Sequence, residues 1–239
     1  MSGLWFVMPV LALIAGIMAL APLGAQVLRR GVVFMDLAIA QAAAAGALAA
    51  LALTQEHRAW ITQTAAAAAA LTATGLVAWL ARKRPAHREA LIGLVYVTCA
   101  CTALLMARLD AHGSEHLQAL LAADVLWSGP REVGMMALCA LGVALMGPRL
   151  QHDRWFYGAF ALVVSLAVPV LGLFIVFAAL IAPAVWHRST QHPGRAIMLA
   201  VMAALAGMGL SWGLDAPSGP LVALSLAMTG LFSPDSVSR

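Results

Sequence analysis

Charged residues are scarce in this chain. Of its 239 residues only 10% are charged, 63% are hydrophobic, and the mean hydropathy is +0.91. Soluble globular proteins carry roughly 25% charged residues, so this composition excludes a protein with water on all sides. A helix that spans a membrane needs about 20 mostly apolar residues, and several stretches of the sequence satisfy that requirement. The composition therefore predicts a protein that crosses a membrane many times.

Cysteine is also rare, and its placement argues against a disulfide or a thiolate metal site. Cys99, Cys101 and Cys139 all fall within apolar segments, and the Cys-x-Cys spacing points the first two to different faces of a helix. We expect all three to act as small buried apolar residues. The net charge of +4 comes from basic residues in short loops, which gives no reason to expect a nucleic-acid partner.

Apolar runs separated by polar breaks predict nine transmembrane segments in a single domain that covers residues 1–239. No basic region precedes the first run, so we expect it to stay in the membrane rather than serve as a cleaved signal. Residues 155–186 form one apolar stretch of 32 residues with Pro169 and Gly172 near its middle, which predicts either two crossings or one crossing with a half-helix. Segment 117–128 is shorter and is expected to be re-entrant or interfacial. The predicted spans are 4–28, 33–53, 60–81, 90–107, 133–147, 155–171, 172–186, 196–214 and 219–232.

The distribution of Lys and Arg predicts the orientation. If Arg29 and Arg30 are cytoplasmic, eleven basic residues lie inside and three outside. The fold class is therefore predicted to be all-α, with eight or nine transmembrane helices, the N-terminus outside and the C-terminus inside. The inner set is Arg29, Arg30, Arg82, Lys83, Arg84, Arg88, Arg149, Arg154, Arg188, Arg195 and Arg239, and the outer set is Arg58, Arg108 and Arg131.

A short polar cluster, His112-Gly113-Ser114-Glu115-His116, interrupts the apolar pattern on the predicted outer side. His112, Glu115 and His116 share one face if the segment is helical. Imidazole and carboxylate are ligands that zinc and manganese accept. The cluster is therefore a candidate metal contact at the outer mouth, and the alternative is a polar loop whose histidines face water.

Two polar residues lie inside the second predicted span. Asp36 is expected either to pair with Arg29 or Arg30 or to line a transport pathway, because an unpaired charge in lipid is costly. Gln41 needs a partner on a neighbouring helix or in a hydrated cavity. Both are therefore candidate pathway residues.

Other features of the spans are expected to be structural. Glu89 adjoins Arg88, which predicts charge pairing at the interface, and Asp215 precedes a Pro-Ser-Gly-Pro turn, where it would cap local backbone. The alanine runs Ala42–Ala45 and Ala65–Ala70 are expected to serve close helix packing alone.

Several blocks, in order along nearly the whole chain, resemble metal-type ABC transporter permeases. These are the membrane subunits of bacterial zinc, manganese and iron importers. No block is diagnostic alone, and the specificity comes from their combination. The blocks are Ala21-Pro22-Leu23-Gly24, Val27-Leu28-Arg29-Arg30 with Asp36 and Gln41, the run from Glu89 to Tyr96, His112 to Leu121 with Val125-Leu126-Trp127, Gly172 to Val185, and Leu214 to Pro220.

The resemblance implies a homodimeric permease in the lipid of the bacterial inner membrane, without a permanently bound cofactor. A cytoplasmic ATP-binding subunit would hydrolyse ATP, since the chain lacks a Gly-x-x-x-x-Gly-Lys-Ser/Thr loop and is not itself expected to be an enzyme. A periplasmic or surface metal-binding protein would deliver a divalent metal ion, zinc or manganese, as the transported substrate.

Two departures from the family pattern leave alternatives open. Many members have a histidine one turn after a Gly-Asp pair in the second span, whereas here Gln41 takes its place and Met35 precedes Asp36. Relatives also carry a helix that docks onto the ATPase between the fifth and sixth spans, where this chain has only residues 148–154. Coupling through the Arg188–Arg195 loop, a weakly coupled or non-transporting scaffold, and a permease for a metal chelate are therefore alternatives.

Overall fold

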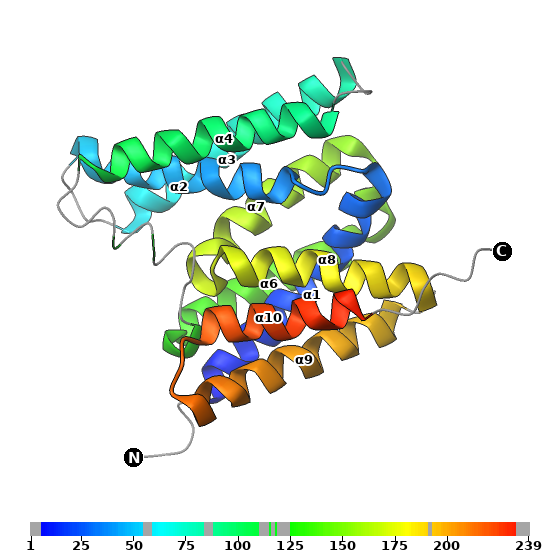
Figure 1. Ribbon diagram of the computed structural model, residues 1–239. Helices are drawn as coiled ribbons and strands as arrows, with labels where there is room; N and C mark the ends of the chain where they lie inside the picture. Colours follow the sequence, from blue (N-terminus) through cyan, green and yellow to red (C-terminus); the bar gives the residue numbers. More distant parts are fainter. Residues whose placement is uncertain are drawn as a thin grey trace.

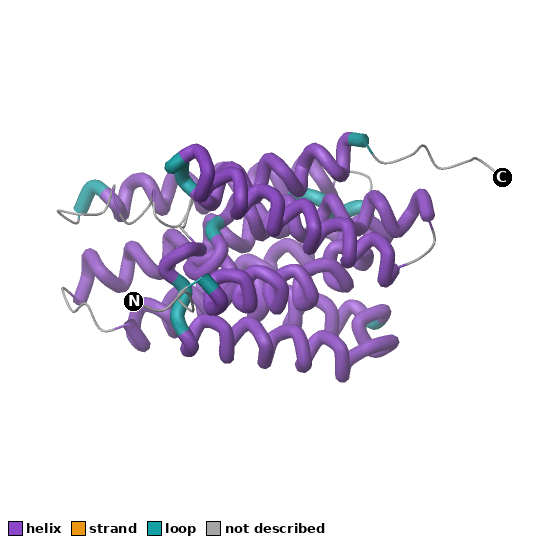
Figure 2. Tube along the Cα trace, turned by 90° about the horizontal axis from the view of Figure 1, so that it is seen from below, coloured by secondary structure: helices purple, strands orange, loops and turns teal. Residues whose placement is uncertain are grey.

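The computed structural model describes residues 6–54, 59–83, 88–109, 115, 118, 125–190 and 193–232. Within these ranges the chain forms nine α-helices. Figures 1 and 2 show these helices packed side by side, with no strand in the described part of the chain. Each predicted span corresponds to one helix, so the all-α polytopic prediction is confirmed. The helices are α1 (Val7–Arg30), α2 (Met35–Thr54), α3 (Ala59–Lys83), α4 (Arg88–Ala107), α6 (Pro130–Met146), α7 (Asp153–Leu171), α8 (Leu173–Thr190), α9 (Pro193–Leu214) and α10 (Ser218–Leu231), with 3-10 turns η2 (Val125–Trp127) and η3 (Gly147–Gln151).

Seven of the described helices are long and apolar enough to cross a membrane. The apolar parts of α8 and α10, Leu173–His187 and Ser218–Leu231, are shorter than the other spans. An apolar helix that is shorter than the hydrocarbon core is accommodated where the bilayer is locally thinner or where neighbouring helices shield its ends from lipid. Both helices pack against each other and against other helices, which supplies that shielding.

The long apolar stretch 155–186 is divided into two helices at Gly172. This glycine has a φ of +80°, a value that side-chain-bearing residues rarely adopt, and its N–H donates to the Val168 carbonyl at 2.8 Å. The carbonyl of Gly172 then accepts the N–H of Val176 at 3.1 Å, which starts α8 at once. Helix α8 runs back in the opposite direction to α7, so of the two predicted arrangements the structure has two separate helices (Figure 1).

Most of the basic residues predicted on the inner side lie at one end of the helix bundle. Arg30 at the end of α1 and Arg82 near the end of α3 both reach Asp153 at the start of α7, at 3.2 and 3.9 Å. Arg131, which was predicted on the outer side, lies in the first turn of α6. That turn is at the opposite end of the bundle (Figure 1). We call the end that carries Arg30 the inner end, and the charge bias predicts that it faces the cytoplasm.

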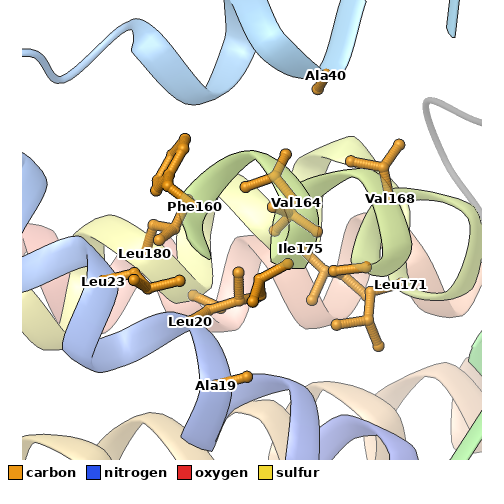
Figure 3. Packing of buried hydrophobic residues seen from close by; sticks show 14 of the residues in the cluster. Ala19, Leu20, Leu23, Ala40, Phe160, Val164, Val168, Leu171, Ile175 and Leu180 are labelled. Atoms are coloured by element: carbon orange, nitrogen blue, oxygen red, sulfur yellow. The ribbon is translucent and has the colours of Figure 1, made fainter. Parts of the chain in front are cut away.

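Helix α1 lies at the centre of the bundle, between α6 and α8. Figure 3 shows Leu20 and Leu23 of α1 packed with Leu171 of α7 and with Ile175 and Leu180 of α8. Gly24 permits this approach, because a Cβ there would lie 2.6 Å from the carbonyl carbon of Leu180. Backbones that approach so closely are typical of helix packing in membranes, where small residues line the contact.

Candidate functional site

The predicted outer metal cluster lies mostly outside the described residues. His112 and His116 are not described, and Glu115 is described as exposed and helical. Among the described residues no group of three or more His, Cys, Asp or Glu side chains is arranged to hold a metal ion. The cluster therefore stays a prediction.

Asp36 is the most unusual polar residue in the described part of the chain. It lies in the first turn of α2, its exposed fraction is 0%, and no side chain of a described residue donates a hydrogen bond to its carboxylate, which has only the backbone N–H groups of Asp36 and Leu37 near it. The predicted pairing with Arg29 or Arg30 is wrong, because Arg30 is engaged with Asp153 and Arg29 is exposed. The amino-terminal end of a helix favours a negative side chain, which offsets only part of the cost of burial.

Gln41 is also buried, with an exposed fraction of 6%. It lies five residues after Asp36 in α2, and Ala44 and Leu48 follow it at i+3 and i+7 on the same face of the helix. Both of those residues line a cavity, so Gln41 lies one turn inward from the cavity wall.

The cavity has a volume of about 540 Å³ and lies between α2, α3, α6 and α7, toward the end of the bundle opposite Arg30. Its polar lining residues lie mainly at the starts of α3 and α6, and its floor is apolar. The polar lining residues are Thr62, Gln63, Arg131, Glu132 and Ser165, and the apolar ones include Ala43, Ala44, Ala47, Leu48, Leu51, Ala66, Val168 and Pro169.

Glu132 and Ser165, two of the polar lining residues, form local hydrogen bonds. Glu132 accepts the backbone N–H of Gly129 at 2.9 Å and caps α6, and the Ser165 hydroxyl donates to the Leu162 carbonyl at 2.9 Å.

The alanine runs do more than the helix packing expected of them, because Ala43, Ala44 and Ala66 form part of the cavity wall.

The cavity and the buried carboxylate are aligned along one helix. Ala43 and Ala47 follow Asp36 by seven and eleven residues, which places all three on one face of α2. Seven residues of helix span about 10 Å, so Asp36 lies about two turns inward from the cavity floor. The cavity could not be predicted from the alanine runs, because alanine is found both in cavity walls and in tightly packed helix interfaces.

Glu89 and Asp215 have structural roles. Glu89 accepts the backbone N–H of Val33 at 3.0 Å through Oε1, while Oε2 is buried without a hydrogen-bond partner among the described groups. The residue thus holds the turn between α1 and α2, and among the described residues it forms no ion pair. Asp215 is exposed and ends α9 with a φ of +50°, which Asp tolerates better than most residues.

The comparisons with known proteins bear on this arrangement. The model of the ABC 3 transport family matches residues 6–147 and 149–234, which is nearly the whole chain. The chain belongs to the ABC 3 transport family. It is therefore a membrane subunit of a transporter and not an enzyme, and the resemblance to ABC permeases is confirmed at the level of the family.

A solved structure supports the same fold for this member of the ABC 3 transport family. The chain is similar to one in the structure of PsaBC from Streptococcus pneumoniae in complex with Fab, with a TM-score of 0.72 and 17% sequence identity. The similarity covers 95% of this chain and 89% of that one. No curated protein matches the chain significantly.

Proposed function

We propose that this chain is the membrane-spanning permease of an ATP-driven importer of divalent metal ions, with zinc and manganese as the leading substrates. The observation that carries the proposal is Asp36, a fully buried carboxylate in a transport protein that has no side-chain partner among the described residues. Ionisable groups inside the membrane are costly and mark substrate or ion pathways. A divalent cation is the ligand that best offsets a buried negative charge.

The cavity supports a route to this carboxylate. It is on the predicted outer side, where an importer receives its substrate, and Asp36 continues the same face of α2 inward. Gln41 lies on a different face of α2, turned about 140° from Asp36. Its amide oxygen is a ligand type that suits manganese better than zinc. Asp36 and Gln41 are the pathway residues in this proposal, and His112, Glu115 and His116 are a weaker contact at the mouth.

The proposed complex is a homodimer of this permease with cytoplasmic ATP-binding subunits and a periplasmic or surface metal-binding protein, in the bacterial inner membrane. The permease must release the ion as well as bind it, so each contact along the path should be modest in affinity. The complex reconstituted in proteoliposomes and tested with radioactive Zn²⁺, Mn²⁺ and Fe²⁺ tests the function directly. ATP-dependent uptake of none of these ions would refute it.

Replacement of both outer histidines, His112→Ala with His116→Ala, should weaken uptake at low metal concentration. Loss of two ligands at the mouth should raise the KM for metal about tenfold, equivalent to about 1.4 kcal/mol, and leave the maximal rate nearly unchanged. The control is Gln118→Ala, an exposed polar residue of the same segment, which should behave like the wild type. Unchanged uptake across all metal concentrations would remove the cluster from the pathway.

A large side chain in the cavity should block the proposed route. Ala47 is 7% exposed and lines the cavity, so Ala47→Phe should lower the maximal uptake rate by roughly tenfold or more by filling the space. Ala137→Phe is the matched control, because Ala137 is exposed on α6 and its side chain would face outward. Full uptake by a folded Ala47→Phe protein would show that the ion takes another path.

A further inference from the structure

Four basic side chains gather at the inner end, where α1 and α3 end and α4 and α7 begin. We call them the inner basic cluster, and they are Arg30 of α1, Arg82 and Lys83 of α3, and Arg88 of α4. Arg30 and Arg82 approach different oxygens of one carboxylate, that of Asp153, at 3.2 and 3.9 Å. One negative charge therefore faces two guanidinium groups, and the cluster keeps a positive charge.

The cluster converges on Tyr157 of α7. The hydroxyl of this half-buried tyrosine lies within electrostatic reach of Arg30, Arg82 and Arg88, which come from three different helices. Arg88 also lies against the end of α1, because one of its guanidinium nitrogens is 2.7 Å from the position that a Cβ on Gly31 would take. The fold thus holds several cations close together, and an anion bound among them would offset their mutual repulsion.

Carboxylates of the described residues do not neutralise this charge. Asp153 is shared between two arginines, and Glu89, which adjoins Arg88, is engaged with the backbone N–H of Val33 at 3.0 Å. Neither Lys83 nor Arg88 forms an ion pair within the described part of the chain. The cluster therefore has positive charge available for an anion from outside the chain.

Two tryptophans mark the depth of the cluster relative to the membrane. Trp79 of α3 and Trp155 of α7 are 54% and 51% exposed, and tryptophan is enriched where the hydrocarbon core meets the lipid headgroups. Arg82 and Lys83 follow Trp79 by about one helical turn, toward the inner end. The ammonium of Lys83 lies 4.7 Å from the centre of the Trp79 ring. These positions place the cluster at the level of the lipid phosphates.

The helix surface that leads to the cluster is apolar and uncovered. Only 28% of the apolar segment of α3 and 22% of that of α4 is buried, and the two helices lie side by side at the edge of the bundle (Figure 1). Leu76, Trp79 and Lys83 have the spacing of one helix face, and the first two are 45% and 54% exposed. A lipid whose headgroup contacts the cluster can therefore lay its acyl chains along α3, which a soluble anion cannot do.

We propose that the inner basic cluster binds the headgroup of an anionic phospholipid in the membrane leaflet at the inner end. Arg82 and Arg88 bond the phosphate oxygens, the Tyr157 hydroxyl donates a further hydrogen bond, and Lys83 lies at the rim over Trp79. Arginine suits this task because its planar group can bond two phosphate oxygens at once. Helices α4 and α7 both begin beside the cluster, and the positive ends of their dipoles favour the same anion. This inference goes beyond the proposed function, because it requires neither a metal ion nor ATP.

The test measures lipid binding to the full-length permease by native mass spectrometry. Phosphatidylglycerol, which is anionic, is compared with phosphatidylcholine, which is zwitterionic, at identical acyl chains. The wild type should bind phosphatidylglycerol about twentyfold more tightly. A basic residue near an anionic membrane surface contributes about fivefold to binding, so Arg82→Gln should lower this preference about fivefold. Arg82→Gln combined with Arg88→Gln should bind the two lipids within about twofold of each other.

The matched control is Arg149→Gln, which removes the same charge from an exposed position in η3 at the same end of the bundle. Its preference for phosphatidylglycerol should stay within about twofold of the wild type. Arg82 is 67% exposed, so Arg82→Gln should keep the fold, and its melting temperature without added lipid checks this. Excess phosphatidylglycerol should raise the melting temperature of the wild type by a few degrees and leave that of the double variant unchanged.

Two results would overturn the inference. An equal loss of preference in Arg149→Gln would mean that the lipid responds only to the net charge of the inner end. An unchanged preference in the folded double variant would place the lipid elsewhere, and a simultaneous loss of dimer in the same spectra would assign the cluster to contact with a second copy of the chain. Neither result bears on metal uptake, so the proposed function is tested separately.

Discussion

Asp36→Asn should abolish metal uptake while the permease stays folded. The substitution keeps the shape of the side chain and removes its negative charge, so a divalent ion loses its main buried counter-charge. We expect the uptake rate to fall on the order of a hundredfold, equivalent to about 2.7 kcal/mol. The melting temperature should be unchanged or higher, because the wild-type carboxylate is fully buried without a side-chain partner among the described residues and a neutral amide is cheaper to bury. Radioactive metal uptake and thermal unfolding in detergent measure the two effects.

The matched control for this prediction is Asp215→Asn. Asp215 undergoes the same chemical change but is exposed at the end of α9, and Asn also tolerates its left-handed backbone conformation. Uptake by this variant should match the wild type. A lower melting temperature for Asp36→Asn with full uptake would assign Asp36 a purely structural role.

The helices were predictable because hydrophobic runs and their breaks are local properties of the chain. Each predicted span corresponds to one helix, and the division at Gly172 follows from a residue that alone accepts a φ of +80° without strain. The charge distribution also predicted that Arg30 and Arg82 lie at the same end of the bundle, and their shared contact with Asp153 confirms this. These signals need no knowledge of which helices are neighbours.

The site was harder to predict because it depends on contacts between distant segments. Proximity in sequence suggested that Asp36 pairs with Arg29 or Arg30. Helix α1 instead continues to Arg30, whose side chain bonds to the Leu150 carbonyl, 120 residues away. Likewise, Ala65 and Ala69 pack tightly against Gly46, while Ala66, one residue from Ala65, lines the cavity. Identical residues in one run thus have opposite roles, which only the helix orientation decides.

Gly24→Ala should strongly destabilise the bundle. A Cβ at position 24 would overlap the backbone of Leu180, at 2.6 Å from its carbonyl carbon and 2.9 Å from its Cα, and real Cβ atoms essentially never approach other atoms within 3.0 Å. The opposing atoms belong to helix backbone and cannot move aside as a flexible side chain would. Overpacking a core costs typically 1–3 kcal/mol, and a clash with backbone should reach or exceed the upper value.

The measurement is the yield of monodisperse protein and its melting temperature in detergent, which should fall by roughly 10 °C or more. Gly75→Ala is the control, because Gly75 is exposed on α3 with no atom within 4 Å of the added Cβ. It should be as stable as the wild type or more so, since alanine favours a helix interior over glycine by about 1 kcal/mol. Equal stability of the Gly24 and Gly75 variants would mean that α1 and α8 are not in backbone contact, and the central position of α1 beside α8 would then be wrong.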